Sequence, residues 1–148
     1  MRLSSLGLIL GLTLPALAAD DTDAAKMRGF WKPTSVVYDG VERFPEGKRR
    51  ESITLVVKDN QYRMYVCLDK AKDEHSRLVT SDFALDEKAK TIALEIKDGP
   101  NKGQKCHGLY ELKDGKLRIC YGPADKAKPT EFGAPAGSGY FCETWTPE

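Results

Sequence analysis

Four cysteines are the side chains of this 148-residue chain that are best suited to chemistry. They are Cys67, Cys106, Cys120 and Cys142. Their spacing matches neither CxxC nor CxxCH, so thioredoxin-like redox chemistry and covalent haem attachment are not indicated. An even number of cysteines in an exported chain is typical of disulfides, and four cysteines allow three pairings. If the last two strands are neighbours, Cys120 pairs with Cys142, which leaves Cys67 for Cys106 by elimination.

The two histidines and Glu143 are the other candidates for chemistry. His75 follows charged residues in a polar turn, where a solvated side chain is expected. Cys106-His107 has the ligand types of a zinc or copper site, but its spacing matches no ligand pattern, so we predict no metal and no cofactor. Glu143 lies among apolar residues, where a buried carboxylate could act as an acid. Strand alternation instead favours an outward-facing Glu143.

No nucleophile elbow, phosphate loop or catalytic triad pattern occurs in the chain, although a triad is recognised by geometry and not by sequence order. We therefore predict a protein that is not an enzyme. The alternative is a hydrolase or isomerase with an unrecognised site, and His107 and Glu143 are the residues on which it would depend.

The elements that position these residues follow an N-terminal export signal. Arg2 precedes an apolar run from Leu6 to Leu17, and Ala16-Leu17-Ala18 is a small-x-small cleavage site. The run is shorter than the roughly 20 apolar residues that span a bilayer. We predict a signal peptide over residues 1–18, with cleavage after Ala19 or an uncleaved anchor as alternatives, and a secreted or periplasmic protein.

Residues 19–148 are the predicted single domain, with 22 basic and 22 acidic residues once Arg2 is removed with the signal. A net charge near zero argues against nucleic acid or an anionic membrane surface as the main partner. Residues 19–28 are expected to form a short helical turn or a disordered lead-in. β-rich segments separated by turn signals then predict an all-β antiparallel sandwich or barrel of seven or eight strands. The segments are 31–38, 51–58, 61–68, 78–85, 91–96, 108–112, 116–121 and 140–146.

Two hairpins have a predicted register. Asp59-Asn60 as a two-residue loop sets Val57 opposite Tyr62 and Leu55 opposite Met64. Asp114-Gly115 is the strongest hairpin signal in the chain. It sets Tyr110 opposite Ile119 and Leu112 opposite Leu117 on one apolar face. Residues 122–139 form a long Gly- and Pro-rich connection, which is either a binding lid or an excursion that Phe132 anchors in the core.

Several motifs in this order resemble the lipocalin-like domain of unknown function that is expanded in planctomycetes. The resemblance implies an antiparallel lipocalin-like barrel and no known reaction. Gly29-Phe30-Trp31 is similar to the Gly-x-Trp entry of lipocalins, in which the Trp packs across the closed end of the barrel beneath an Arg of the last strand. The last strand here has no Arg or Lys, so Trp145 is expected to share this closing role with Trp31. The other matching segments are 36–40, 98–103, 108–112, 114–120, 128–132 and 137–139.

The inward faces give the leading functional hypothesis, which is binding of a small apolar or amphipathic ligand. An eight-stranded barrel either fills its interior with side chains or holds one small ligand. The large inward side chains favour filling, and a cavity near the mouth, under the 122–139 loop, is the arrangement that binding requires. The alternative is a filled-core envelope or extracellular protein that contacts a protein partner through loops or an edge strand. The candidate ligand-binding residues are Tyr62, Met64, Val66, Tyr110, Ile119 and Phe132.

Overall fold

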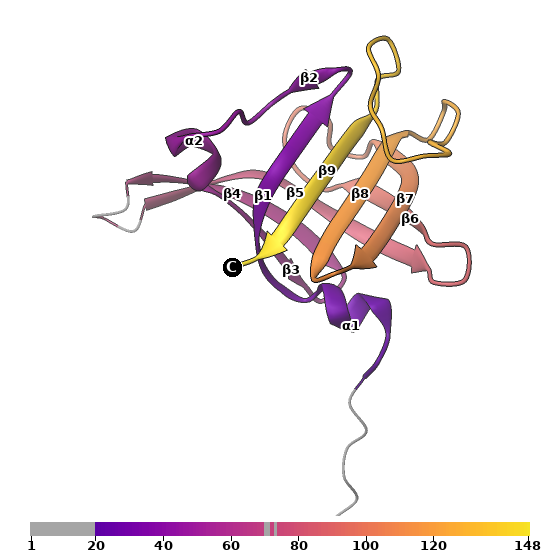
Figure 1. Cartoon of the computed structure of the whole chain (residues 1–148), viewed down its shortest axis with the longest axis horizontal. Coiled ribbons are helices and arrows are strands. Elements are labelled where there is room, and N and C mark those ends of the chain that lie inside the picture. The colour runs from indigo at the N-terminus through magenta and orange to yellow at the C-terminus, as the bar shows by residue number, and fades with distance from the viewer. Residues whose placement is uncertain (1–19, 70–71, 73) are drawn as a thin grey trace, which may run out of the picture.

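The computed structural model describes residues 20–69, 72 and 74–148, so the predicted signal peptide lies outside the described residues. Two short helices and nine strands follow one another along this part of the chain (Figure 1). They are α1 (Asp23–Met27), β1 (Gly29–Tyr38), β2 (Val41–Glu42), α2 (Lys48–Glu51), β3 (Ile53–Lys58), β4 (Gln61–Asp69), β5 (Glu74–Asp86), β6 (Thr91–Ile96), β7 (Lys105–Lys113), β8 (Lys116–Pro123) and β9 (Phe141–Pro147). None of the helices in the described residues is long and apolar enough to cross a membrane.

The strands form a closed antiparallel barrel. Each strand from β3 to β9 pairs with the next along the chain, and β1 pairs with both β3 and β9, which closes the ring of eight. The two-residue β2 lies outside this ring, against the end of β1. This up-and-down order is the one that lipocalins have. The all-β barrel of about eight strands and the short N-terminal helix predicted from the sequence are therefore confirmed.

Both predicted hairpin registers are confirmed. Leu55 lies opposite Met64 in the β3–β4 pair, and Tyr110 lies opposite Ile119 in the β7–β8 pair. The turn residues take the left-handed conformation that a two-residue type I′ turn requires, with φ of 58° at Asn60 and 70° at Gly115. Because side chains alternate along a strand, these registers fix which residues face the barrel interior.

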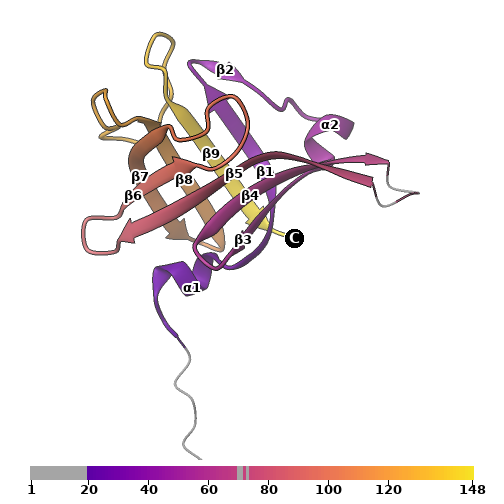
Figure 2. The same cartoon turned by 180° about the vertical axis from the view of Figure 1, so that it is seen from behind.

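The β4–β5 hairpin is longer than the sequence predicts and extends beyond the barrel wall (Figures 1 and 2). A register shift lies between Val79 and Arg77, which pair with consecutive residues of β4. Leu78 is the extra residue at this bulge, and 46% of its surface is exposed. Leu78 nevertheless lines the same hollow as its neighbour Val79, at the open end of the barrel.

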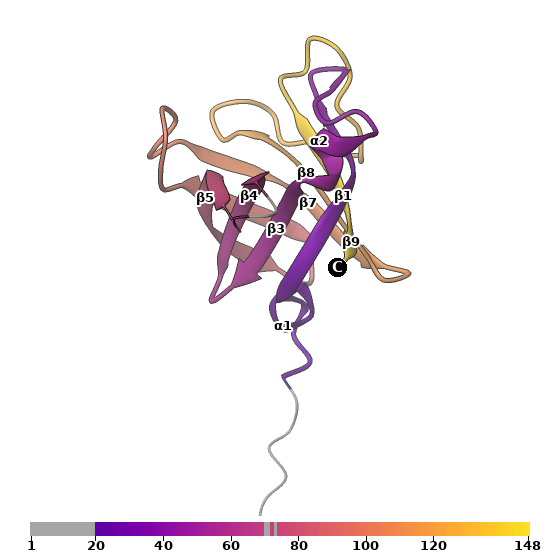
Figure 3. The ribbon, with the colours of Figure 1, turned by 90° about the vertical axis from the view of Figure 1, so that its left-hand side faces the viewer.

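One end of the barrel is filled and closed, and α1 covers it (Figure 3). Trp145, Leu117 and Ile119 are fully buried there, and Trp31 is 6% exposed. The Trp31 Nε1 donates a hydrogen bond to the Met27 carbonyl of α1 at 2.8 Å. Trp31 thus attaches helix α1 directly to the closed end of the barrel.

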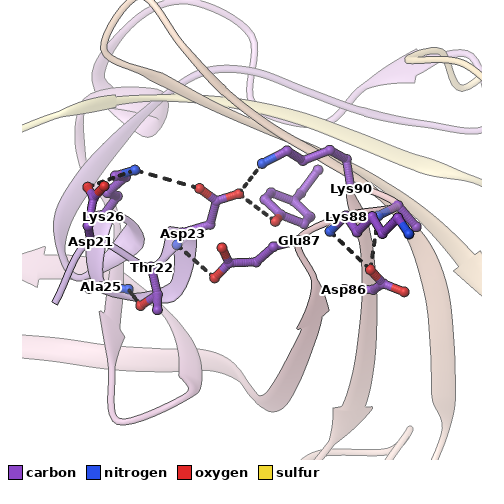
Figure 4. A network of polar contacts seen from close by, with 11 residues as sticks. Asp21, Thr22, Asp23, Ala25, Lys26, Asp86, Glu87, Lys88 and Lys90 are labelled. Atoms are coloured by element: carbon purple, nitrogen blue, oxygen red, sulfur yellow. Dashed lines mark hydrogen bonds and ion pairs between the residues drawn. The ribbon is translucent and has the colours of Figure 1, made fainter.

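A polar network joins α1 to the turn between β5 and β6 (Figure 4). The Asp23 carboxylate accepts hydrogen bonds from the Tyr110 hydroxyl at 2.6 Å and from the Lys90 ammonium. The Glu87 carboxylate accepts the Asp23 backbone N–H at 2.9 Å. The hydrogen bonds from Lys90 and Tyr110 lower the pKa of Asp23, so this residue is ionised at neutral pH.

Asp23→Asn is expected to lower the free energy of unfolding by about 1.5–3 kcal/mol, since hydrogen bonds to charged groups contribute that much. The contribution in the wild-type protein should disappear as pH falls through the lowered Asp23 pKa, below its usual value of 3.8. Urea denaturation at pH 7 and at a series of lower pH values, down to the lowest at which the protein stays folded, measures both effects. A variant that loses as much stability at the lowest of these pH values as at pH 7 would contradict a role for the Asp23 charge.

Candidate functional site

A buried carboxyl group lies inside the barrel, above its filled end. Glu143 of β9 is 1% exposed and lies between Val36 of β1 and Ile119 of β8 in the sheet. This position corrects the sequence-based prediction that Glu143 faces outward. Phe141, Glu143 and Trp145 share one face because strand side chains alternate, and the closure of β9 onto β1 turns that face inward.

Three neutral groups donate hydrogen bonds to Glu143. The Tyr121 hydroxyl donates to Oε1 at 2.9 Å. The Tyr62 hydroxyl and the Trp145 Nε1, the latter at 3.0 Å, both donate to Oε2. A carboxylate has about four acceptor sites, so one remains on Oε1. Glu143, Tyr62, Tyr121 and Trp145 are called the Glu143 cluster below.

The electrostatics of the Glu143 cluster are set by burial. Burial raises the pKa of Glu143 and outweighs the opposing effect of the three hydrogen bonds. Burial also raises the pKa values of Tyr62 and Tyr121 well above their usual range, so both hydroxyls keep their protons. Within residues 20–69, 72 and 74–148, no cationic side chain pairs with Glu143. The site can therefore accept a proton, or a cationic or hydrogen-bond-donating group.

An aromatic wall runs from the barrel mouth to the Glu143 cluster. Tyr38, Phe141 and Tyr121 are cross-strand neighbours on β1, β9 and β8. The Tyr38 and Phe141 ring centroids are 4.3 Å apart, and those of Phe141 and Tyr121 are 5.4 Å apart, in both cases with stacked rings. Cross-strand pairing thus builds a continuous π surface that ends at Oε1 of Glu143.

The aromatic wall borders a cavity of about 970 Å³. Its floor includes Glu143 and Tyr121, and its other walls include Met64, Val79 and Cys106. Arg43 lies at the mouth, with its guanidinium carbon 5.9 Å from the centroid of the Tyr38 ring. The volume falls within the range of small-molecule sites, and the lining combines apolar and aromatic side chains with polar ones. The barrel is therefore filled at its lower end and hollow at its upper end.

Comparisons with known proteins add little beyond the fold. No protein-family model matches the chain, and no curated protein matches it. Among solved structures, the chain is similar to the crystal structure of a lipocalin-like protein from Bacteroides uniformis, with 12% sequence identity. That similarity covers 82% of this chain and 98% of the other, with a TM-score of 0.44.

The candidate binding residues lie at different depths in the barrel. Met64 lines the cavity, and Tyr62 belongs to the Glu143 cluster just below it. Tyr110 and Ile119 are buried in the filled end, and Val66 is a half-buried side chain packed against the core. The structure thus brings only Met64 and Tyr62 to the cavity or its floor.

The structure corrects the prediction that Phe132 is a ligand-binding residue. Phe132 lies on the outer face of the barrel. The Arg118 guanidinium carbon is 4.4 Å from the Phe132 ring centroid, and Arg118 points outward from β8. The 122–139 connection is therefore neither a lid with Phe132 beneath it nor an excursion anchored in the core. Only its two ends, at Gly122 with Pro123 and at Gly139, border the cavity.

The sequence-based predictions do not include the aromatic wall, and they place Glu143 on the outer face of the barrel. A signal for both was present in β9, where an acidic residue is flanked two positions away on each side by Phe141 and Trp145. Two large aromatic residues at that spacing indicate the buried face of a strand, so the residue between them shares the interior.

The cysteines also depart from expectation, since all four are free thiols in this structure. Cys120 and Cys142 are direct cross-strand partners on the outer face of β8 and β9. Cys67 lies on an outer groove of β4, whereas Cys106 of β7 lines the interior cavity. Strands β5 and β6 separate β4 from β7, so the predicted Cys67–Cys106 disulfide is wrong. Among the described residues, no three His, Cys, Asp or Glu side chains gather as a metal-binding set.

Oxidation is expected to join Cys120 to Cys142 and to leave the other two cysteines as thiols. Cys142 is half-buried and Cys120 is fully buried, so glutathione disulfide reacts first at Cys142 and releases one glutathione. The hydrogen bond from Cys142 lowers the pKa of Cys120 to about 7, which favours the Cys120 thiolate that then displaces the second glutathione. Treatment with glutathione disulfide, which accepts the two electrons, followed by alkylation and peptide mapping tests this. A linked Cys67–Cys106 peptide, or a Cys120 that stays alkylatable, would be inconsistent with the geometry. Cys67→Ser is the control that should leave the link intact.

Proposed function

We propose that this barrel binds a small amphipathic molecule in its cavity. The observation that carries the proposal is the buried Glu143 cluster at the floor of a hollow of about 970 Å³. The apolar part of the ligand lies along the aromatic wall, and its polar group reaches Oε1 of Glu143. The hollow upper half argues against a filled-core protein that acts only through its surface.

A pair of neighbouring residues on β4 offers a matched test. Met64 points into the cavity and Tyr65 points away from it. Saturable binding of the amphipathic fluorophore N-phenyl-1-naphthylamine is expected for the wild type and for Tyr65→Trp. Met64→Trp fills the cavity and should weaken binding by about tenfold or more, which corresponds to about 1.4 kcal/mol. Absence of saturable binding to the wild type, or equal binding by both variants, would refute the proposal.

We further propose that the protein is exported and belongs to the lipocalin-like group of unknown function that is expanded in planctomycetes. Export is supported by Arg2, the apolar run from Leu6 to Leu17 and the Ala16-Leu17-Ala18 site. Membership is supported by the order of the short motifs from Gly29-Phe30-Trp31 onward. N-terminal sequencing of protein recovered outside the cytoplasm tests the export proposal, and a start at Ala19 or Asp20 is the expected result.

A further inference from the structure

The Glu143 cluster is incomplete in one respect. Buried charges in proteins are paired or fully hydrogen-bonded, yet every donor to Glu143 is neutral and one acceptor site on Oε1 is unused. The unused site belongs to the oxygen that Tyr121 also contacts, and Tyr121 lines the cavity. A positively charged donor entering from the cavity would complete the hydrogen bonding and neutralise the carboxylate in one contact.

The aromatic wall is also suited to a positive charge. Cations are attracted to the faces of aromatic rings, and this attraction increases in sites that exclude water. The wall already carries such a contact at its outer end, where the Arg43 guanidinium lies over Tyr38. At its inner end the wall meets a carboxylate instead of a cation. A ligand with one positive end therefore has a preferred orientation, with that end directed at the floor and away from Arg43.

We infer that the cavity selects a protonated organic amine attached to a flat apolar or aromatic body. This inference rests on the proposed function and narrows it to a ligand class. The ammonium group donates to Oε1 of Glu143 and lies against Tyr121, while the apolar body stacks along Phe141 and Tyr38. The other charged groups at the mouth have partners within the protein: Asp98 pairs with Arg77 at 3.0 Å and Glu42 pairs with Arg50 at 3.7 Å.

Three phenylalkyl probes of similar size and different charge test the inference by isothermal titration calorimetry on the mature protein. They are 2-phenylethylammonium, the neutral isostere propylbenzene and, as the nearest carboxylate in size, the anion phenylacetate. The ammonium probe is expected to bind at least about tenfold more tightly than propylbenzene, which is the lower end of what a single hydrogen bond between charged groups contributes. The anion should bind most weakly.

Two Glu-to-Gln variants provide the matched comparison. Glu143→Gln should remove the preference for the ammonium probe and keep propylbenzene binding. Glu111→Gln alters a carboxylate that faces outward on β7 and pairs with Arg118 at 3.3 Å, and it should keep the preference. Phe141→Leu should weaken all three probes, because it removes the centre of the aromatic wall.

Proton release gives a readout that does not depend on any variant. The titratable side chains around Glu143 inside the barrel are Tyr62 of β4, Tyr121 of β8 and the Cys106 thiol of β7, and burial raises the pKa of each. The Cys120 and Cys142 thiols lie on the opposite face of the sheet. A cation at Oε1 lowers the raised pKa of Glu143, so binding near that pKa should release a proton. Titrations in buffers of different ionisation enthalpy measure the release.

The outcomes separate this inference from the proposed function. Equal or tighter binding of propylbenzene, or no proton release on amine binding by the wild type at any pH across the range in which the protein is folded, overturns the amine inference and leaves ligand binding intact. If none of the three probes binds, and N-phenyl-1-naphthylamine also fails to bind, both proposals fall. Preference for the ammonium probe together with its loss in Glu143→Gln supports the inference.

Discussion

Trp145→Ala is expected to lower the free energy of unfolding by about 3–5 kcal/mol, the usual cost of truncating a buried aromatic residue. Trp145 is fully buried, and its ring packs edge-on against Tyr62 with 6.5 Å between centroids. Its Nε1 also donates to Glu143 at 3.0 Å. The truncation therefore opens a void in the filled end of the barrel and removes one donor from the Glu143 cluster. Urea denaturation followed by circular dichroism measures the loss.

An exposed aromatic residue at the start of β1 provides the control. Phe30 is 62% exposed, so Phe30→Ala should change stability by no more than about 0.5 kcal/mol. Trp145→Phe separates the contribution of the buried ring to stability from that of its N–H, because the variant keeps most of the buried area and removes the hydrogen bond. If Trp145→Ala costs no more stability than Phe30→Ala, the filled end of the barrel is not packed as described.

The strands and hairpin registers could be predicted because their signals are local. Asp59-Asn60 and Asp114-Gly115 fix two-residue turns, and a two-residue turn fixes the register of the strands on either side. The apolar pairs that follow from these registers, such as Leu55 with Met64, are present in the barrel. Local turn chemistry therefore determined which residues face one another across two of the strand pairs.

The cavity and its floor could not be predicted in the same way. Alternation divides a strand into two faces, but which face of β9 is inside depends on its pairing with β1, more than 100 residues away in the chain. The turn signals carry no information about that closure, so alternation alone predicts the wrong face for Glu143. Phe132 was misplaced for a related reason, because a Gly- and Pro-rich connection has no period from which a face can be inferred.

Glu143→Ala is expected to lower the free energy of unfolding by about 3 kcal/mol or more, because it leaves three donors without an acceptor and each buried orphan costs about 1–3 kcal/mol. The donors are Tyr62, Tyr121 and Trp145. Glu143→Gln keeps one acceptor oxygen and should cost less. Thermal unfolding of both variants beside the wild type gives the comparison. Equal stability of Glu143→Ala and the wild type would show that the cluster does not support the barrel floor.

The same carboxyl group should make stability depend on pH in a direction opposite to that of Asp23. Burial raises the pKa of folded Glu143 above its usual value of 4.5. The usual value applies to the unfolded chain. At a pH between the pKa of the unfolded state and that of the folded state, folded Glu143 keeps a proton that the unfolded chain has lost, so the free energy of unfolding falls as pH rises. Glu143→Gln cannot titrate and should lack this fall, and the difference between the two pH profiles isolates it. A bound ammonium probe lowers the Glu143 pKa and should also flatten the wild-type profile, so one titration links the stability of the barrel floor to the charge of its ligand.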